Sequence, residues 1–314
     1  MKLRKYFKIN TPKELSKQLG VSLDRISRVV LNLSDNFVFR EKIKDKKGKE
    51  RDFYEAKGDL KIIHNKIDKN LLNRIYYPET MQGGIKGRSI KSNAKFHTGK
   101  RYVANFDIAK FFPSVSNRVV YRTFINKKCA PDVASQLTKL TTVNGQLPQG
   151  FKTSPKISGL VLRNIDERLS ILLKPLNLIH TFWIDDLTIS GNYPIAKLKR
   201  IVEKIFRQGG FKLNANKTYI ANRKQQQICT GLTVNCGINP SKEFRKKLRR
   251  ELYICKKFGV KNYLEKNNIV MDMKSYIWSL KGRVNFLISI NHDYKKYKEI
   301  VEKLKYEGWF VKFC

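Results

Sequence analysis

The stretch TFWIDDLTIS, residues 181–190, most constrains what this chain can fold into, because two acidic residues separate two segments typical of strands. Residues 181–184 and 187–190 are rich in β-branched and aromatic side chains. A two-residue hairpin turn favours Asn-Gly or Asp-Gly, since both central residues need a positive φ, and adjacent carboxylates repel each other. The sequence therefore predicts a hairpin at Asp185-Asp186 that breaks local turn chemistry and marks a functional site.

A third carboxylate, Asp107, ends a predicted strand over residues 102–107. If this strand and the hairpin are neighbours in one sheet, the three carboxylates converge, and their repulsion calls for cations. Hard oxygen ligands suit Mg²⁺, and two such ions about 4 Å apart can activate an attacking hydroxyl and stabilise a leaving pyrophosphate. The pattern predicts a two-metal Mg²⁺ site for nucleotidyl transfer at Asp107, Asp185 and Asp186.

Charge narrows the class of partner. The 314 residues include 65 Lys and Arg against 26 Asp and Glu, which gives a formal net charge of +39. The isoelectric point of about 10.1 is in the range of nucleic-acid binders. No apolar run approaches the roughly 18–20 residues of a membrane span, and no secretory signal, amphipathic anchor or lipidation signal is apparent. We expect a cytoplasmic nucleic-acid-binding protein with no membrane partner.

Two segments, one near the N-terminus and one in the C-terminal tail, have helical patterns that are compatible with nucleic-acid binding. Two short apolar-periodic segments around Gly20 mimic a helix-turn-helix, which leaves a DNA-binding regulator open as a function, although such pairs are also common scaffolding. From about Pro240 the tail is basic and helical, with one apolar face and with cations mostly off that face. The apolar face is formed by Phe244, Leu248, Leu252 and Cys255.

Four segments occur in the order and spacing of the palm motifs of reverse transcriptases: FDIAKFFPS, LPQGFKTSP, WIDDLTIS and LNANKT. Upstream, GRSIKSNAKFH resembles the N-A-x-x-H element of bacterial retron reverse transcriptases, and CTGLTVN resembles their V-T-G element. The resemblance implies an α+β right-hand polymerase fold. Residues 1–100 would form N-terminal helices and fingers, 101–238 the palm with part of the fingers at about 115–160, and 239–314 a basic, helical thumb.

The resemblance also implies roles at the acidic site. Asp107 and Asp185 would bind the catalytic Mg²⁺ ions, with Asp186 as a further ligand or as electrostatic support. Phe112 would be a steric gate whose ring fills the volume of a ribonucleotide 2′-hydroxyl, with an ordinary core aromatic as the alternative. The usual Tyr before the two aspartates is Trp183, followed by Ile184, which implies a reshaped floor beneath the primer terminus.

Four further residues would contact the incoming nucleotide. Arg51, in a basic hairpin, matches the arginine that clamps the triphosphate, for which a bidentate guanidinium is suited. Gln149 would touch the nucleotide, and Gly150 would let the backbone approach it closely. Lys217 would assist the leaving pyrophosphate, with a solvated surface lysine as the alternative.

RNA contacts are expected in two places. Asn93 and His97 match the retron-type N-A-x-x-H element, although a buried polar pair is an equal alternative. In the thumb, Arg245, Lys246 and Arg249 would bind RNA phosphates. Phosphate contacts alone are indiscriminate, so selection of one RNA would need further contacts to its shape, loops or unpaired bases.

Family membership implies RNA-directed DNA synthesis from dNTPs, with a structured non-coding RNA as template and primer. The product would be a branched RNA–DNA molecule (msDNA), and the context would be anti-phage defence with an effector protein. One alternative is another defence-associated bacterial reverse transcriptase, such as one that makes untemplated DNA. Another is a catalytically weak scaffold that only holds nucleic acid, which Trp183 leaves open.

Overall fold

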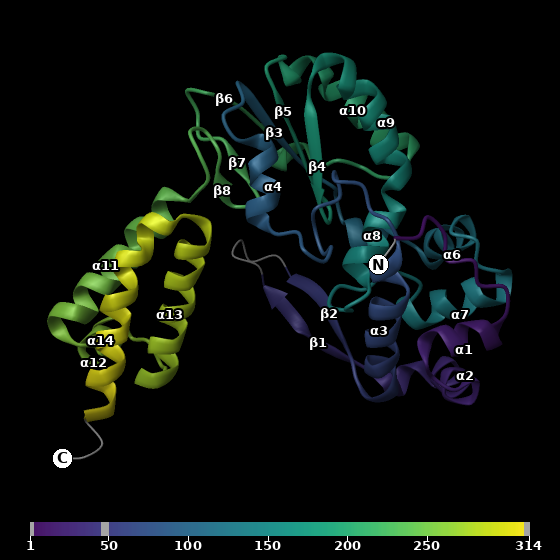
Figure 1. Ribbon diagram of the computed structural model, residues 1–314, viewed down its shortest axis with the longest axis horizontal. Coiled ribbons are helices and arrows are strands. Elements are labelled where there is room, and N and C mark those ends of the chain that lie inside the picture. The colour runs from purple at the N-terminus through teal and green to yellow at the C-terminus, as the bar shows by residue number, and fades with distance from the viewer. Residues whose placement is uncertain (1–2, 45–49, 311–314) are drawn as a thin grey trace.

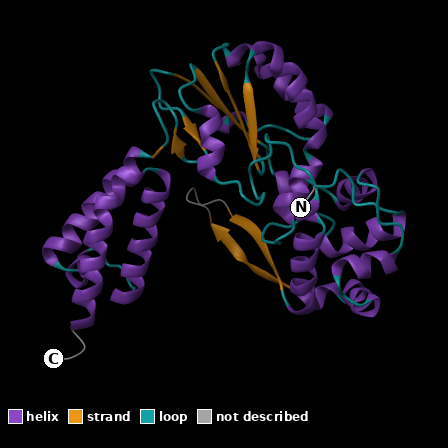
Figure 2. Ribbon diagram, in the orientation of Figure 1, coloured by secondary structure: helices purple, strands orange, loops and turns teal. Residues whose placement is uncertain are grey.

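The computed structural model describes residues 3–44 and 50–310, which form an arch of mixed helices and strands (Figures 1 and 2). The strands are β1 Phe37–Lys44, β2 Glu50–Ala56, β3 Tyr102–Asp107, β4 Ile179–Trp183, β5 Asp186–Gly191, β6 Tyr219–Asn222, β7 Ile228–Cys229, β8 Leu232–Thr233 and β9 Asn239–Pro240. The α-helices are α1 Pro12–Leu19, α2 Leu23–Leu31, α3 Gly58–Asn70, α4 Ile90–His97, α5 Phe111–Ser114, α6 Asn117–Asn126, α7 Pro131–Thr141, α8 Ser154–Val161, α9 Arg163–Leu173, α10 Lys199–Gln208, α11 Lys242–Phe258, α12 Val260–Lys266, α13 Met273–Ile290 and α14 Lys296–Phe310.

A four-stranded antiparallel sheet, here called the palm sheet, lies at the top of the arch in the order β4-β5-β3-β6 (Figure 1). The strand predicted over residues 102–107 is confirmed as β3. It pairs along its whole length with β5, from Tyr102 opposite Gly191 to Asp107 opposite Asp186. Segments about 80 residues apart in the chain therefore end at the same edge of one sheet, as the convergence of the carboxylates requires.

Helices α9 and α10 lie against the palm sheet (Figure 1). A buried hydrogen bond joins Asp166 of α9 to His180 of β4, with 2.9 Å between Oδ1 and Nε2. The amphipathic α10 buries Val202, Ile205 and Phe206. These contacts fix the edge strand β4, and with it the hairpin that carries the acidic pair.

The fingers region, residues 3–100 of the predicted division, shares one hydrophobic core with the palm sheet. That core extends from Phe7 to Leu213 and includes the two helices that mimic a helix-turn-helix. Their apolar side chains Leu15, Leu19 and Ile26 are all fully buried in it. Because these side chains pack inward, α1 and α2 form part of the scaffold, in contact with α3 and α7.

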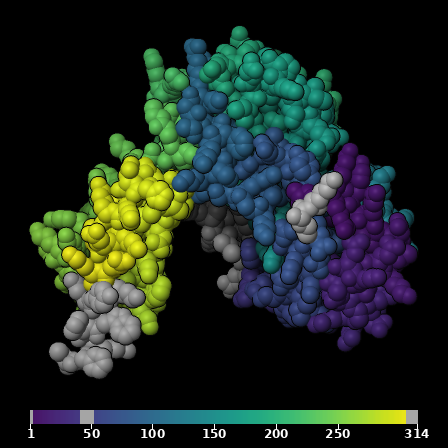
Figure 3. All heavy atoms as spheres, in the orientation of Figure 1, coloured from purple at the N-terminus to yellow at the C-terminus, as the bar shows by residue number. Residues whose placement is uncertain are grey.

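The thumb, residues 239–310, has a separate hydrophobic core built from α11 to α14. The apolar face expected in its first helix is confirmed, since Leu248, Leu252 and Cys255 are buried, while Phe244 is partly buried. A small third cluster contains Ala94 of α4, Val103 of β3 and Ile290 of α13 and links the thumb to the palm. The space-filling view shows the molecule hollowed between the thumb and the fingers (Figure 3).

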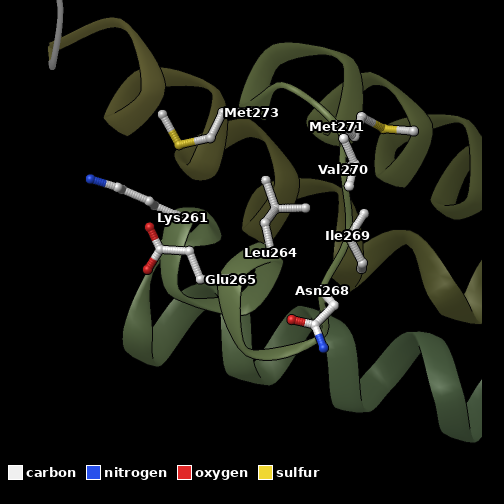
Figure 4. Close-up of a pocket in the computed structure, with 8 residues that line it drawn as sticks. All are labelled: Lys261, Leu264, Glu265, Asn268, Ile269, Val270, Met271 and Met273. Carbon is white, nitrogen blue, oxygen red and sulfur yellow. The ribbon is translucent and has the colours of Figure 1, made fainter.

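The far end of the thumb has an open hollow of about 580 Å³ beside the loop between α12 and α13 (Figure 4). Leu264 contributes to its wall, and Val270 and Met271 are exposed side chains of the loop. None of the helices in the described part of the chain combines the length and apolar character needed to cross a membrane.

Candidate active site

The acidic site lies at the edge of the palm sheet where β3 ends and β5 begins. Asp107 is the last residue of β3 and faces Asp186, the first residue of β5. The predicted hairpin exists, but its central turn residues are Ile184 and Asp185, because Asp186 already pairs with Trp183. The prediction of an Asp-Asp turn was therefore wrong by one residue. Asp185 lies within the turn, and Asp186 belongs to the strand.

The turn itself is strained. Ile184 has a φ of 61°, and a β-branched residue rarely adopts this left-handed conformation. Strained backbone persists where the surroundings hold it, and it concentrates at functional sites. The hairpin thus lacks the Asn or Gly expected of such a turn, and tertiary contacts must hold it in place.

A segment that the sequence reading missed supplies those contacts. The Phe182 N–H donates to the Thr80 carbonyl at 2.6 Å, and the Phe182 carbonyl accepts from Gln82 N–H at 2.7 Å. Gly83 lies directly against the turn: a Cβ added there would come within 2.3 Å of Ile184 N. Any side chain at position 83 would therefore displace the turn that carries Asp185.

Arg88 stabilises the segment around residues 77–83 that contacts the turn. Its guanidinium donates to the backbone carbonyls of Tyr77, Pro78 and Met81. Gly84 is also close-packed, since an added Cβ would come within 2.4 Å of Pro155 Cβ. The two adjacent glycines in MQGGIKGR were the sequence signal for this support.

Asp107 is tied to two residues of the LNANKT segment. The Lys217 ammonium lies 2.8 Å from Asp107 Oδ1, and the Asn214 side-chain amide donates to Oδ2 at 3.3 Å. The Asn214 backbone N–H also donates to the Asp107 carbonyl at 2.8 Å. Lys217 was predicted for the site, whereas Asn214 was not. These contacts hold the Asp107 carboxylate in a fixed orientation.

Asp107, Asp185 and Asp186 are of the residue type that binds divalent cations, but their side chains are not arranged as a metal site. Carboxylate oxygens at adjoining strand ends are the donors that hard cations prefer. Across residues 3–44 and 50–310, however, no group of three or more His, Cys, Asp or Glu side chains is disposed to hold a metal ion. In this arrangement the positive charge beside Asp107 comes from Lys217.

Phe112 lies in the short helix α5, immediately after β3. Its neighbour Phe111 is buried and packs on Phe211, with 5.5 Å between ring centroids. Phe112 is only partly buried. The two rings are T-shaped at 5.4 Å, so Phe111 anchors the helix in the core and Phe112 sits at its margin.

Gln149 and Gly150 lie against the fingers hairpin. The Gln149 carbonyl accepts from Tyr54 N–H of β2 at 2.9 Å. Gly150 has a φ of 101°, and an added Cβ would come within 2.3 Å of the Tyr54 carbonyl oxygen. Close packing on β2 thus already requires this glycine. Arg51 lies in β2 opposite Ile43, and its side chain falls outside the described residues.

Asn93 and His97 are inside the protein. Both are fully buried in α4. The two ring nitrogens of His97 bond to the hydroxyls of Ser190 and Thr181, each at 2.7 Å. Burial lowers the pKa of His97 to about 3, so its ring is neutral. The predicted direct contact with RNA is wrong for this arrangement, because neither side chain reaches a surface.

The thumb cations divide into two kinds. Arg245 was expected to face outward, but it is partly buried and donates to the Pro240 carbonyl at 3.1 Å and to the Tyr294 hydroxyl at 3.3 Å. Lys246 and Arg249 are exposed as expected. Arg245 thus braces α11 within the thumb, and two of the three predicted cations remain available to solvent.

Most of this chain resembles known proteins in sequence. Residues 43–245 match the family described as reverse transcriptase (RNA-dependent DNA polymerase). The chain is 35% identical over 255 residues to the Retron Se72 reverse transcriptase of Salmonella heidelberg, covering 78% of this chain and 67% of that protein. It is 26% identical over 299 residues to the Retron Ec86 reverse transcriptase of Escherichia coli, covering 93% and 88%. The matched region includes all three aspartates.

Proposed function

We propose that this chain, which belongs to the reverse transcriptase family and within it to the retron enzymes, copies a structured non-coding RNA that also provides the primer. Its general activity is RNA-directed DNA polymerisation within a right-hand polymerase fold. The proposal adds the kind of template, the origin of the primer and a branched RNA–DNA product.

The observation that carries the catalytic assignment is the edge where Asp107 faces Asp186 across β3 and β5, with Lys217 at 2.8 Å from Asp107. Reverse transcription generally requires a divalent metal. Asp107, Asp185 and Asp186 would hold Mg²⁺, which supplies charge neutralisation at the attacking hydroxyl and at the leaving pyrophosphate. Lys217 is close enough to this edge to donate to a phosphate oxygen of the pyrophosphate.

Selection of the nucleotide would fall to residues beside this edge. Phe112, partly buried in α5, has a ring that would clash with a ribose 2′-hydroxyl. Gln149 and Arg51 would contact the base or triphosphate from the side of the fingers. The main-chain bond between Gln149 and Tyr54 couples that loop to the hairpin that contains Arg51.

Two features support an RNA that is both bound and copied. The net charge of +39 favours a long phosphate footprint. The thumb has its own core and exposes Lys246 and Arg249. In the retron setting, the branched product would stay with the protein, and an effector protein of an anti-phage defence system would be a further partner.

The test is to purify the full chain from cells that carry its surrounding genomic region and to sequence the nucleic acid that copurifies. We expect one predominant RNA, with DNA complementary to part of it and attached to it at a branch. Treatment with ribonuclease should shorten this product without removing the DNA. DNA with no complementary RNA would instead support untemplated synthesis, and RNA with no DNA would support a scaffold.

A further inference from the structure

The opposite end of the palm sheet carries a second polar site. A hollow of about 650 Å³ is lined by Arg101, Tyr102, Asn192, Asn222, Arg223 and Lys224. These residues come from three separate segments, which meet because Tyr102 of β3 pairs with Gly191 of β5 on one side and with Asn222 of β6 on the other. Since Tyr102 begins the strand that Asp107 ends, the hollow lies about 17 Å from the acidic edge.

The lining offers hydrogen-bond donors and positive charge. Three of the six lining residues are Arg or Lys, and none is acidic. The Asn192 side-chain oxygen accepts from Arg101 N–H at 3.4 Å, and the Asn222 side-chain oxygen accepts from Lys224 N–H at 2.9 Å. Among the residues that the structure describes, neither side-chain NH₂ group donates to a protein acceptor, so both can donate to a ligand. Such a set suits an anion such as a phosphate.

The hollow also has a stacking surface. The Arg101 guanidinium lies over the Tyr102 ring, 5.5 Å from its centroid, and Arg101 is exposed. Tyr102 packs against the palm core on its inner side. A planar group could therefore stack on the outer face of the Arg101 guanidinium, above the Tyr102 ring. Unpaired RNA bases stack on arginine and aromatic planes in this way.

The walls of the site are held in place. Gln227 is fully buried, and its amide donates to the carbonyls of Lys100 and Arg101, each at 3.1 Å. Arg223 donates to the Gly99 carbonyl at 2.9 Å. A stable backbone reduces the ordering cost of binding.

We propose that this hollow, here called the rear pocket, binds an unpaired nucleotide of the RNA that the enzyme copies. The base stacks on Arg101, and Arg223 and Lys224 contact the neighbouring phosphates. The pocket is too far from Asp107 to hold the reacting nucleotide, so it retains a part of the RNA that is not being copied. This inference rests on the proposed function, because it assumes that the RNA is a bound, structured partner.

The test compares two sets of three substitutions with the same change in charge. One set is Arg101→Ala, Arg223→Ala and Lys224→Ala in the rear pocket. The control set is Arg200→Ala, Lys204→Ala and Arg207→Ala, which are exposed residues of α10. Binding of an unstructured RNA octamer is measured against salt concentration, and a DNA octamer of the same sequence and an RNA duplex are compared.

We expect the pocket variant to bind the RNA octamer about tenfold more weakly than the control variant does, since stacking and phosphate contacts are lost together. Its salt slope should fall by about 1.4, the value for two phosphate contacts on a single strand. The DNA octamer presents the same bases and phosphates, so the pocket variant should also bind it more weakly than the control variant does. Equal losses in the two variants, or equal losses of octamer and duplex, would overturn the proposal.

A single substitution separates stacking from charge. Arg101→Lys keeps the charge and removes the planar group, so binding of the octamer should weaken several-fold while binding of the duplex is unchanged. No change in octamer binding would refute the stacking arrangement, and so would displacement of the octamer by free dNTPs.

Extension of a generic primer–template should stay at the wild-type rate in every variant. A wild-type enzyme that extends this substrate but carries no RNA of its own would refute the proposed function while leaving the octamer result valid.

Discussion

The palm and the thumb differ in how their hydrophobic cores are built and in what they expose to solvent. The palm sheet shares a continuous core with the fingers and uses buried polar contacts, such as His97 with Ser190 and Thr181. The thumb packs four helices around a core of its own and leaves aromatic side chains outside, with Tyr253 58% and Trp278 56% exposed. The palm is thus built to fix the positions of a few atoms, whereas the thumb is built to present a surface.

This difference predicts which changes affect chemistry and which affect binding. Around Asp107, two side chains and a strand pairing fix one carboxylate. On α11, Lys246 and Arg249 project from a helix whose other face is buried. A substitution in the palm should therefore change the rate at constant affinity, and one on the thumb surface should do the reverse.

The largest effect is expected from Asp185→Asn combined with Asp186→Asn. We expect loss of these carboxylates, which we propose hold the metal, to remove about 4 kcal/mol of stabilisation of the transition state, or roughly a thousandfold in rate. Binding of RNA should stay within a few-fold of wild type, because phosphate contacts come from Lys and Arg elsewhere. Single-turnover incorporation and a filter-binding assay measure the two quantities. Incorporation at the wild-type rate would rule out the assigned site.

The next effect concerns acid stability in the palm and fingers. Burial lowers the pKa of His64 to about 4 and that of His97 to about 3, from 6.5 when unfolded. Both rings are neutral in the folded state and take up a proton on unfolding below pH 6.5. The contribution of these two histidines to the free energy of unfolding is therefore present above that pH and is lost as the pH falls. The free energy of unfolding decreases by about 2 kcal/mol for each histidine between pH 7 and pH 5.

Chemical denaturation at pH 7 and pH 5 measures this loss. His97→Gln should reduce the difference between the two pH values by about 2 kcal/mol, whatever its effect at pH 7. His64→Gln, at the other buried ring, should reduce the difference by a similar amount. An unaltered difference in His97→Gln would mean that this ring does not stay neutral in the fold.

Independent packing of the thumb is tested by Arg283→Met. Arg283 of α13 is paired with the buried carboxylate of Glu251 on α11, and removal of the cation leaves that charge inside the thumb core. We expect the thumb to lose between about 1 and 2 kcal/mol, a value reduced because Arg283 is partly exposed.

Hydrogen exchange should locate that loss in α11 to α14, with no change in the palm sheet. Lys298→Met removes an exposed ion pair with Glu302 and serves as the control, with little expected effect. Equal loss of protection in palm and thumb would show that the two cores unfold as one unit.

Nucleotide selection is a smaller effect in the palm. Phe112→Val should raise ribonucleotide use relative to deoxynucleotide use by about tenfold, or about 1.4 kcal/mol, because it removes the ring that we propose meets the 2′-hydroxyl. Phe112→Tyr keeps the ring and should retain the selectivity. Competition between the two kinds of nucleotide gives the ratio. If Phe112→Val selects as the wild type does, Phe112 is a packing residue.

The smallest effect is expected on the thumb surface. Lys246→Ala with Arg249→Ala should weaken binding of every RNA several-fold and lower the salt slope by about 1.5, the value for two phosphate contacts. Addition of Arg245→Ala should change the slope little further, because Arg245 braces the helix through Pro240 and Tyr294. A further decrease in slope equal to that of each exposed residue would mean that Arg245 also contacts phosphate.

The sequence alone determined the features whose chemistry depends on residue type and spacing. The strand 102–107 and the buried face of α11 followed from strand and helix periodicities, which relate neighbours within one element. The three aspartates stood out at strand ends and at a turn, whereas Lys217 was predicted only through the resemblance to reverse transcriptase motifs. Metal-dependent polymerisation needs carboxylates at fixed points, so these patterns were readable without coordinates.

Only the tertiary structure decided the positions that depend on contacts between distant segments. The turn at Ile184-Asp185 is held by Gly83, about 100 positions earlier, and no local propensity predicts it. Likewise, Arg245 was expected on a surface, and the sequence left His97 open between an RNA contact and burial. Both are engaged in packing, because their bonding partners come from other elements of the fold. Sequence periodicity shows which face of an element is apolar, but a buried polar group is satisfied only by the atoms that folding brings to it.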